Sequence, residues 1–191
     1  MRDPIAHLSF SAPVKAAFYM FGAVVSFTLM AIAGRTLAPN LDTFEIMTFR
    51  SLFGIILVLG IAWSVGSTRQ INTQKIGLHL LRNLSHFFGQ NLWFYAILYI
   101  PLAQMFAFEF SVPLWVALAA PLFLKEKITG TRLFAAAGGF VGILVVAQPD
   151  FSSIDYAIIA AFFCALGFSG ATIATKQLTR TQSTACILFW L

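Results

Sequence analysis

The chain has 191 residues, a formal net charge of +5 and a composition that is 59% hydrophobic and only 10% charged. Soluble domains carry about 25% charged residues, so this composition excludes an ordinary soluble protein and predicts an all-α, polytopic membrane protein. Basic residues stand singly between apolar runs instead of forming one basic face, so nucleic-acid binding is not indicated.

Six membrane-spanning helices are expected from the apolar runs. About 20 apolar residues in a helix cross a hydrocarbon core of about 30 Å. The first run is too long for the core of a cleavable signal peptide, and no small-residue cleavage pattern follows it. The chain stops at ACILFWL, which is too short to cross a bilayer and is expected to form the first turns of a seventh span. The six expected spans cover residues 14–34, 44–65, 78–99, 102–124, 133–147 and 156–175.

Lysine and arginine are distributed unevenly between the two sides of these spans. Because cytoplasmic loops of membrane proteins carry the excess of basic residues, the N-terminus is predicted to be cytoplasmic and the protein to lie in the inner (plasma) membrane. Arg35 is then the clear basic residue on the outer side. The cytoplasmic side holds Arg2, Lys15, Arg69, Lys75, Arg82, Lys125, Lys127, Arg132, Lys176 and Arg180.

The fourth expected span carries a single charged side chain, Glu109, four residues before Pro113. A charge inside a span costs about 2.5–3.5 kcal/mol on insertion scales, so Glu109 should face protein, water or a partner. Arg50, in the second span, is expected at a similar depth of about 10 Å from the outer side, where the two could meet. Two interpretations remain open, a structural ion pair or a substrate-binding and proton-coupling site.

The third expected span is the least apolar. Arg82, His86 and Gln90 follow one another at intervals of four residues and therefore share one helical stripe, with Asn91 beside it. This stripe either lines a solute pathway or makes hydrogen bonds between helices. Trp93 is a candidate for stacking on a flat or cationic substrate, although an aromatic belt at the membrane interface explains it equally well.

Other motifs indicate packing instead of chemistry. Gly138 and Gly142 form a GxxxG pair that is typical of close helix packing. Cys164 and Cys186 show no metal-ligand spacing and are interpreted as packing residues. His7 and the other histidines form no ligand set, so neither a metal nor any other cofactor is predicted.

Enzymatic and ATP-driven functions are not favoured. The sequence GFSG around Ser169 resembles the GxSG motif of rhomboid intramembrane proteases, but no histidine follows Ser169 to serve as its base. The phosphate-binding pattern GxxxxGK[ST] is absent from the sequence.

The first and sixth expected spans resemble each other. Five spans separate the two copies, and because five is odd the second copy crosses the membrane in the opposite direction. Secondary transporters with such inverted repeats bind their substrates near the bilayer midplane, at the repeat interface. An offset of 141 residues aligns Phe21 with Phe162, Phe27 with Phe168, Thr28 with Ser169, Arg35 with Lys176, and Leu37 with Leu178.

Four stretches carry a resemblance to a known family: FEIMTFRSLFG, LRNLSHFFGQNLWFYAILYIPLAQ, FSVPLWVALAAPLFLKEKIT and GGFVGILVVAQP. Together they resemble the EamA domain of the drug/metabolite transporter superfamily. The resemblance implies ten spans in two inverted halves, with a first repeat over residues 1–149 and the start of a second, truncated repeat over 150–191. Arg50, Pro113 and Glu126 match recurrent positions of the family, and Glu126 is implied to be a structural residue at the cytoplasmic end of its span.

The resemblance implies a secondary transporter that moves a small metabolite or drug-like solute by alternating access. Its expected partners are the lipid bilayer, the solute and, as a candidate coupling ion, the proton. The candidate translocation residues are Arg50, His86, Gln90, Asn91, Trp93 and Glu109. The missing half is expected either from further chain or from a second copy in a dimer. The alternative function is a membrane-embedded scaffold or an inactive transporter fragment.

Overall fold

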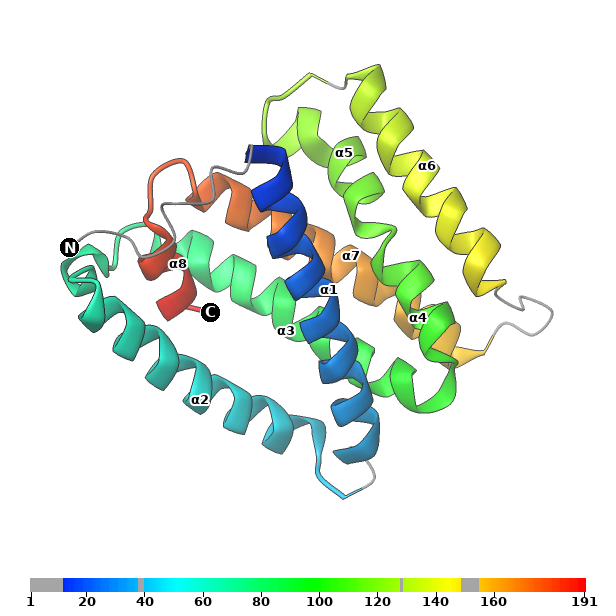
Figure 1. Cartoon of the computed structure of the whole chain (residues 1–191), viewed down its shortest axis with the longest axis horizontal. Helices are drawn as coiled ribbons and strands as arrows, with labels where there is room; N and C mark the ends of the chain where they lie inside the picture. Colours follow the sequence, from blue (N-terminus) through cyan, green and yellow to red (C-terminus); the bar gives the residue numbers. More distant parts are fainter. Residues whose placement is uncertain (1–11, 38–39, 128, 149–154) are drawn as a thin grey trace.

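The computed structural model describes residues 12–37, 40–127, 129–148 and 155–191, and helices are the regular structure of this part (Figure 1). Arg2 and His7, named above, lie outside the described residues. The helices are α1 (Ala12–Leu37), α2 (Thr43–Ser64), the short 3-10 helix η1 (Thr68–Gln70), α3 (Ile76–Tyr99), α4 (Leu102–Glu109), α5 (Val112–Phe123), α6 (Gly130–Ala147), α7 (Tyr156–Leu178) and α8 (Thr184–Phe189).

In the described part of the chain, four segments are long and apolar enough to cross a membrane: α1, α2, α4 with α5, and α7. This confirms the prediction of a polytopic helical membrane protein. The other two expected spans are also helical. α3 has 24 residues but carries the polar stripe, and α6 has 18 residues that include the apolar run 133–147.

α3 and α7 pack along each other at the centre of the bundle, while α2 and α6 lie at its opposite edges (Figure 1). The two central helices cross where Gly89 faces Gly167. A Cβ atom on Gly167 would lie 3.0 Å from the backbone of Gly89, so only glycine permits this approach. Both glycines lie near the middle of their helices.

The close approach at Gly138 and Gly142 that the GxxxG pattern predicts is not found. A Cβ atom on either residue would meet nothing within 4 Å. The prediction is wrong because α6 lies at the edge of the bundle and turns these glycines away from its neighbours. The GxxxG spacing permits a close approach, but it does not say which helix face meets a partner.

The hydrophobic core lies between α3, α7 and α4. Trp93 and Ile97 from α3 pack there with Ala161 and Cys164 from α7 and with Met105 from α4. Both cysteines are buried, as expected of packing residues.

Arg35 fastens the end of α1 to this core. Its guanidinium donates to the carbonyl oxygens of Ile97 and Ile100, at the C-terminal end of α3. These last carbonyls have no partner within the helix, so Arg35 both satisfies them and places a cation at the negative end of the helix dipole.

The fourth span is interrupted, whereas the sequence predicted one continuous helix over 102–124. α4 ends at Glu109 and α5 begins at Val112. Pro113 has no N–H group with which to bond the carbonyl oxygen of Glu109, which explains a break at this position. The main chain is therefore irregular beside the one carboxylate of the span. Interrupted spans of this kind frame the binding sites of many transporters.

The outer faces of α1 and α2 are apolar and open. Phe18, Tyr19, Phe53 and Trp63 are each at least 65% exposed. Such surfaces are stable against lipid tails or against further protein, which agrees with a position inside a bilayer.

Candidate functional site

Arg50 reaches from α2 to α3. Its Nη2 atom lies 3.2 Å from Nε2 of His86. A guanidinium only donates hydrogen bonds, so Nε2 is the acceptor and the ring proton of His86 resides on Nδ1. The Nη1 atom of Arg50 lies 3.9 Å from the sulfur of Met30 on α1, which is a weak acceptor.

His86 also contacts α7. Its ring lies 5.4 Å, centroid to centroid, from the ring of Phe168, which packs directly over Gly89. We call Met30, Arg50, His86 and Phe168 the Arg50–His86 cluster. It draws one side chain from each of α1, α2, α3 and α7, and it lies beside the crossing of α3 and α7.

Glu109 has a different partner. Nε1 of Trp93 donates to Oε2 of Glu109 at 3.0 Å. Only 1% of Trp93 is exposed, so its ring is a core element that holds the carboxylate in place instead of a free stacking surface. At the same break, the indole N–H of Trp115 donates to the hydroxyl of Ser111 at 3.0 Å.

Arg50 and Glu109 do not form the ion pair that their similar depths suggested. Among the described residues, the partners of Arg50 are His86 and Met30, and the hydrogen-bond partner of Glu109 is Trp93. The structural-bridge interpretation therefore has no support, and the two charges form separate polar centres.

The residues of the predicted polar stripe on α3 do not share one environment. Gln90 is 2% exposed, and its amide nitrogen has no hydrogen-bond partner among the described residues. Asn91 donates to the carbonyl oxygen of Phe87 at 2.8 Å and lies 3.7 Å from the sulfur of Met47 on α2. The central part of the stripe therefore faces α2 and α7.

Arg82, at the other end of the stripe, holds α8. It donates to the carbonyl oxygen of Ile187 at 3.0 Å and to the side chain of Asn83. Asn83 in turn donates to the carbonyl oxygen of Trp190 at 2.5 Å. These bonds hold α8 against α3.

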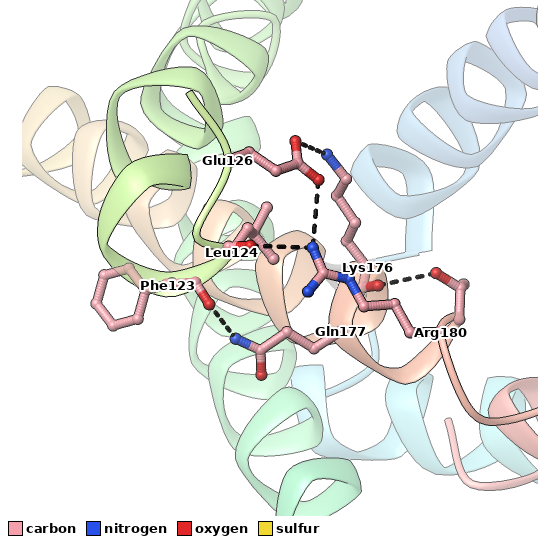
Figure 2. A network of polar contacts seen from close by, with 7 residues as sticks. Phe123, Leu124, Glu126, Lys176, Gln177 and Arg180 are labelled. Atoms are coloured by element: carbon pink, nitrogen blue, oxygen red, sulfur yellow. Dashed lines mark hydrogen bonds and ion pairs between the residues drawn. The ribbon is translucent and has the colours of Figure 1, made fainter. Parts of the chain in front are cut away.

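A third polar centre joins the end of α5 to the end of α7 (Figure 2). Figure 2 shows Glu126 between Lys176 Nζ at 2.7 Å and Arg180 Nη2 at 3.3 Å. Arg180 also donates to the carbonyl oxygen of Leu124 at 3.0 Å, and Gln177 donates to that of Phe123 at 2.7 Å. We call this network the Glu126 clasp.

The sequence placed Glu126 at a structural helix end but did not identify its partners on α7. The sequence does hint at these partners, because Lys176 and Arg180 are predicted to lie on the same side of the membrane as Glu126. A groove of about 610 Å³ runs along α5, from Phe110 and Pro113 at the helix break to Glu126 and Lys176. It connects the break beside Glu109 with the clasp.

Several known proteins are similar to this chain in sequence. The riboflavin transporter of Brucella anthropi is 34% identical over 120 residues, which are 63% of this chain and 42% of that protein. The S-adenosylmethionine uptake transporter of Rickettsia felis is 28% identical over 167 residues, 87% of this chain and 56% of that protein. The pseudopaline exporter of Pseudomonas aeruginosa is 27% identical over 166 residues, 86% of this chain and 58% of that protein.

The chain thus spans about half the length of the curated relatives it matches. No solved structure matches it at a significant level. The EamA-like transporter family matches residues 14–148, which is most of the chain. The protein therefore belongs to the EamA-like transporter family.

Proposed function

We propose that the protein is a secondary transporter, or one half of it, that moves a small organic metabolite across the inner membrane by alternating access. Similar proteins are named for riboflavin, S-adenosylmethionine and pseudopaline, and both uptake and export occur among them. Riboflavin and S-adenosylmethionine are polar solutes with a planar heteroaromatic ring. We expect a solute of that size and polarity here.

The observation that carries this proposal is the position of the Arg50–His86 cluster. It combines side chains of the predicted first repeat with Phe168 of the predicted second repeat, beside the central helix crossing. Substrate sites of transporters with inverted repeats lie near the midplane at this interface. Ionisable residues inside spans are expensive and are functional by default.

Glu109 is the proposed coupling carboxylate. It lies at the break between α4 and α5, and Trp93 donates to one of its oxygens. Protonation removes the negative charge, and with it the electrostatic cost of moving this part of the span between water and a closed interior. Trp93 acts through Glu109 as a positioning residue.

The rest of the pathway is proposed to come from an inverted partner half. The curated relatives are nearly twice as long as the matched region, and the apolar faces of α1 and α2 are open. In the proposed orientation the N-terminus is cytoplasmic, so the Glu126 clasp lies at the cytoplasmic face.

The test is solute uptake into proteoliposomes with an imposed pH gradient, using labelled riboflavin and S-adenosylmethionine as first probes. We expect the protein to accumulate one of them above empty liposomes, and Glu109→Gln to reduce gradient-driven uptake to background. Arg69→Gln, which removes an exposed charge on η1, is the matched control and should transport normally. Folding of each variant is checked by circular dichroism and size-exclusion chromatography.

A folded protein that moves neither probe would contradict transport of this solute class and favour a scaffold role. If Glu109→Gln takes up solute as fast as the wild-type protein, the proposal of transport stands, but Glu109 is excluded as the coupling group.

A further inference from the structure

We propose that the Arg50–His86 cluster is an anion-binding subsite, so that the transported solute carries a carboxylate or a phosphate group. This inference rests on the proposed transport function and names the chemistry of the solute at that site.

Arg50 carries a positive charge, and none of the described residues supplies a counter-ion for it. The guanidinium has five N–H groups and no acceptor, and its two contacts are a neutral imidazole nitrogen and a thioether sulfur. Neither contact compensates the charge. Arg50 is also exposed in this chain, so the described residues leave its remaining N–H groups uncovered.

Every acidic residue in the described part of the chain is engaged elsewhere. In the capping box of α2, Glu45 accepts from the backbone N–H of Asp42, and the carboxylate of Asp42 accepts from the backbone N–H of Glu45. Asp155 caps α7. Glu109 accepts from Trp93, and Glu126 forms the clasp. No carboxylate in the described part of the chain therefore neutralises Arg50, which leaves this charge for an anion from elsewhere.

His86 adds a donor to the same cluster. Because Nε2 accepts from Arg50, the ring proton is on Nδ1, and none of the described residues accepts a hydrogen bond from it. The polar groups of the cluster are thus donors, and a ligand must supply acceptors. Carboxylate and phosphate match the planar fork of arginine through two parallel hydrogen bonds.

The surroundings favour an anion attached to an apolar or planar body. Met30 and the ring of Phe168 form the apolar wall of the cluster. An anion bound to Arg50 offsets the cost of placing a charge within the span. Loaded and empty carriers would therefore differ in the net charge that they hold at this depth.

The experiment compares matched pairs of solutes that differ in one acidic group. The probes are riboflavin 5′-phosphate against riboflavin, S-adenosylmethionine against its methyl ester, and nicotinate against nicotinamide. Binding to the purified protein is measured by thermal shift and by titration calorimetry. The variants are Arg50→Gln, Arg50→Lys and, as the matched control, Arg69→Gln.

We expect at least one acid to bind the wild-type protein about tenfold or more tightly than its neutral partner. This preference should vanish in Arg50→Gln, remain in part in Arg50→Lys, which keeps the charge but loses the fork, and be unchanged in Arg69→Gln. Equal binding of acids and neutral partners would overturn the proposal. An acid preference that survives in Arg50→Gln, or the failure of every acid to bind the folded wild-type protein, would overturn it too.

These outcomes are separate from the transport test. Uptake of a neutral probe with no acid preference would leave the proposed function intact and remove only the anion subsite. Binding of acids without any uptake would support the anion subsite and contradict the proposed transport function.

Discussion

At Gly167 the main chains of α7 and α3 approach each other too closely to admit a side chain. A methyl group there would lie 3.0 Å from the backbone atoms of Gly89 and from the carbonyl oxygen of Ser85. Backbone atoms cannot move aside by a rotamer change, as the end of a flexible side chain can. The helices would have to separate, and Phe168 and His86 would move with them.

We therefore predict that Gly167→Ala destabilises the protein by about 1–3 kcal/mol, the usual effect of overpacking. Gly142→Ala is the matched control, because a methyl group there meets nothing within 4 Å and alanine is the better helix former. The measurement is the midpoint of thermal unfolding in detergent, followed by circular dichroism. A Gly167→Ala midpoint equal to that of the wild-type protein would show that the two helices are not in contact here.

At the scale of the helix, local sequence patterns predict most of the architecture. Long apolar runs identify the spans, since insertion into a bilayer depends mainly on length and composition. The break at 110–111 was not predicted, although Pro113 was noticed. A proline removes one backbone hydrogen bond, but whether the helix then bends or stops depends on the packing around it.

The interruption of the fourth span leads to a prediction about Pro113. Pro113→Ala supplies the missing N–H group, so α4 and α5 should join into one helix and the carboxylate of Glu109 should turn away from Trp93. We expect unchanged or higher thermal stability together with a severalfold lower rate of solute uptake in proteoliposomes.

Pro121→Ala is the matched control for this experiment. Pro121 lies inside α5, where the helix continues past it, so its replacement should leave uptake unchanged. If Pro113→Ala transports as well as the wild-type protein, the break has no role in the transport cycle.

At the scale of the whole molecule, the sequence gives the depth of each side chain but not the helix face on which it lies. Depth alone suggested that Arg50 could meet Glu109, and it left Trp93 as either a stacking residue or part of an aromatic belt. The observed partners, His86 for Arg50 and Glu109 for Trp93, depend also on helix rotation and on which helices are neighbours. These are long-range properties of packing, so the sequence identifies the polar residues within the spans but not their contacts.

The Glu126 clasp is the contact by which the predicted first repeat holds the end of α7, and its strength should depend on salt. The side chains of Glu126, Lys176 and Arg180 are 25%, 39% and 51% exposed, so water and ions screen the charges. Exposed ion pairs contribute about 0–1 kcal/mol each. We predict that Glu126→Gln lowers the stability of the protein by about 1 kcal/mol at low ionic strength.

This difference should nearly disappear at 1 M salt, because the screening length falls from about 10 Å at 0.1 M to about 3 Å. Lys127→Gln removes one exposed charge beside the clasp without breaking either ion pair, so it should not reduce stability. Exchanging the charges in Glu126→Lys with Lys176→Glu should recover part of the loss. The measurement is thermal unfolding of all variants at both salt concentrations. A loss in Glu126→Gln that is equal at low and high salt would mean that packing, and not charge, joins the ends of α5 and α7.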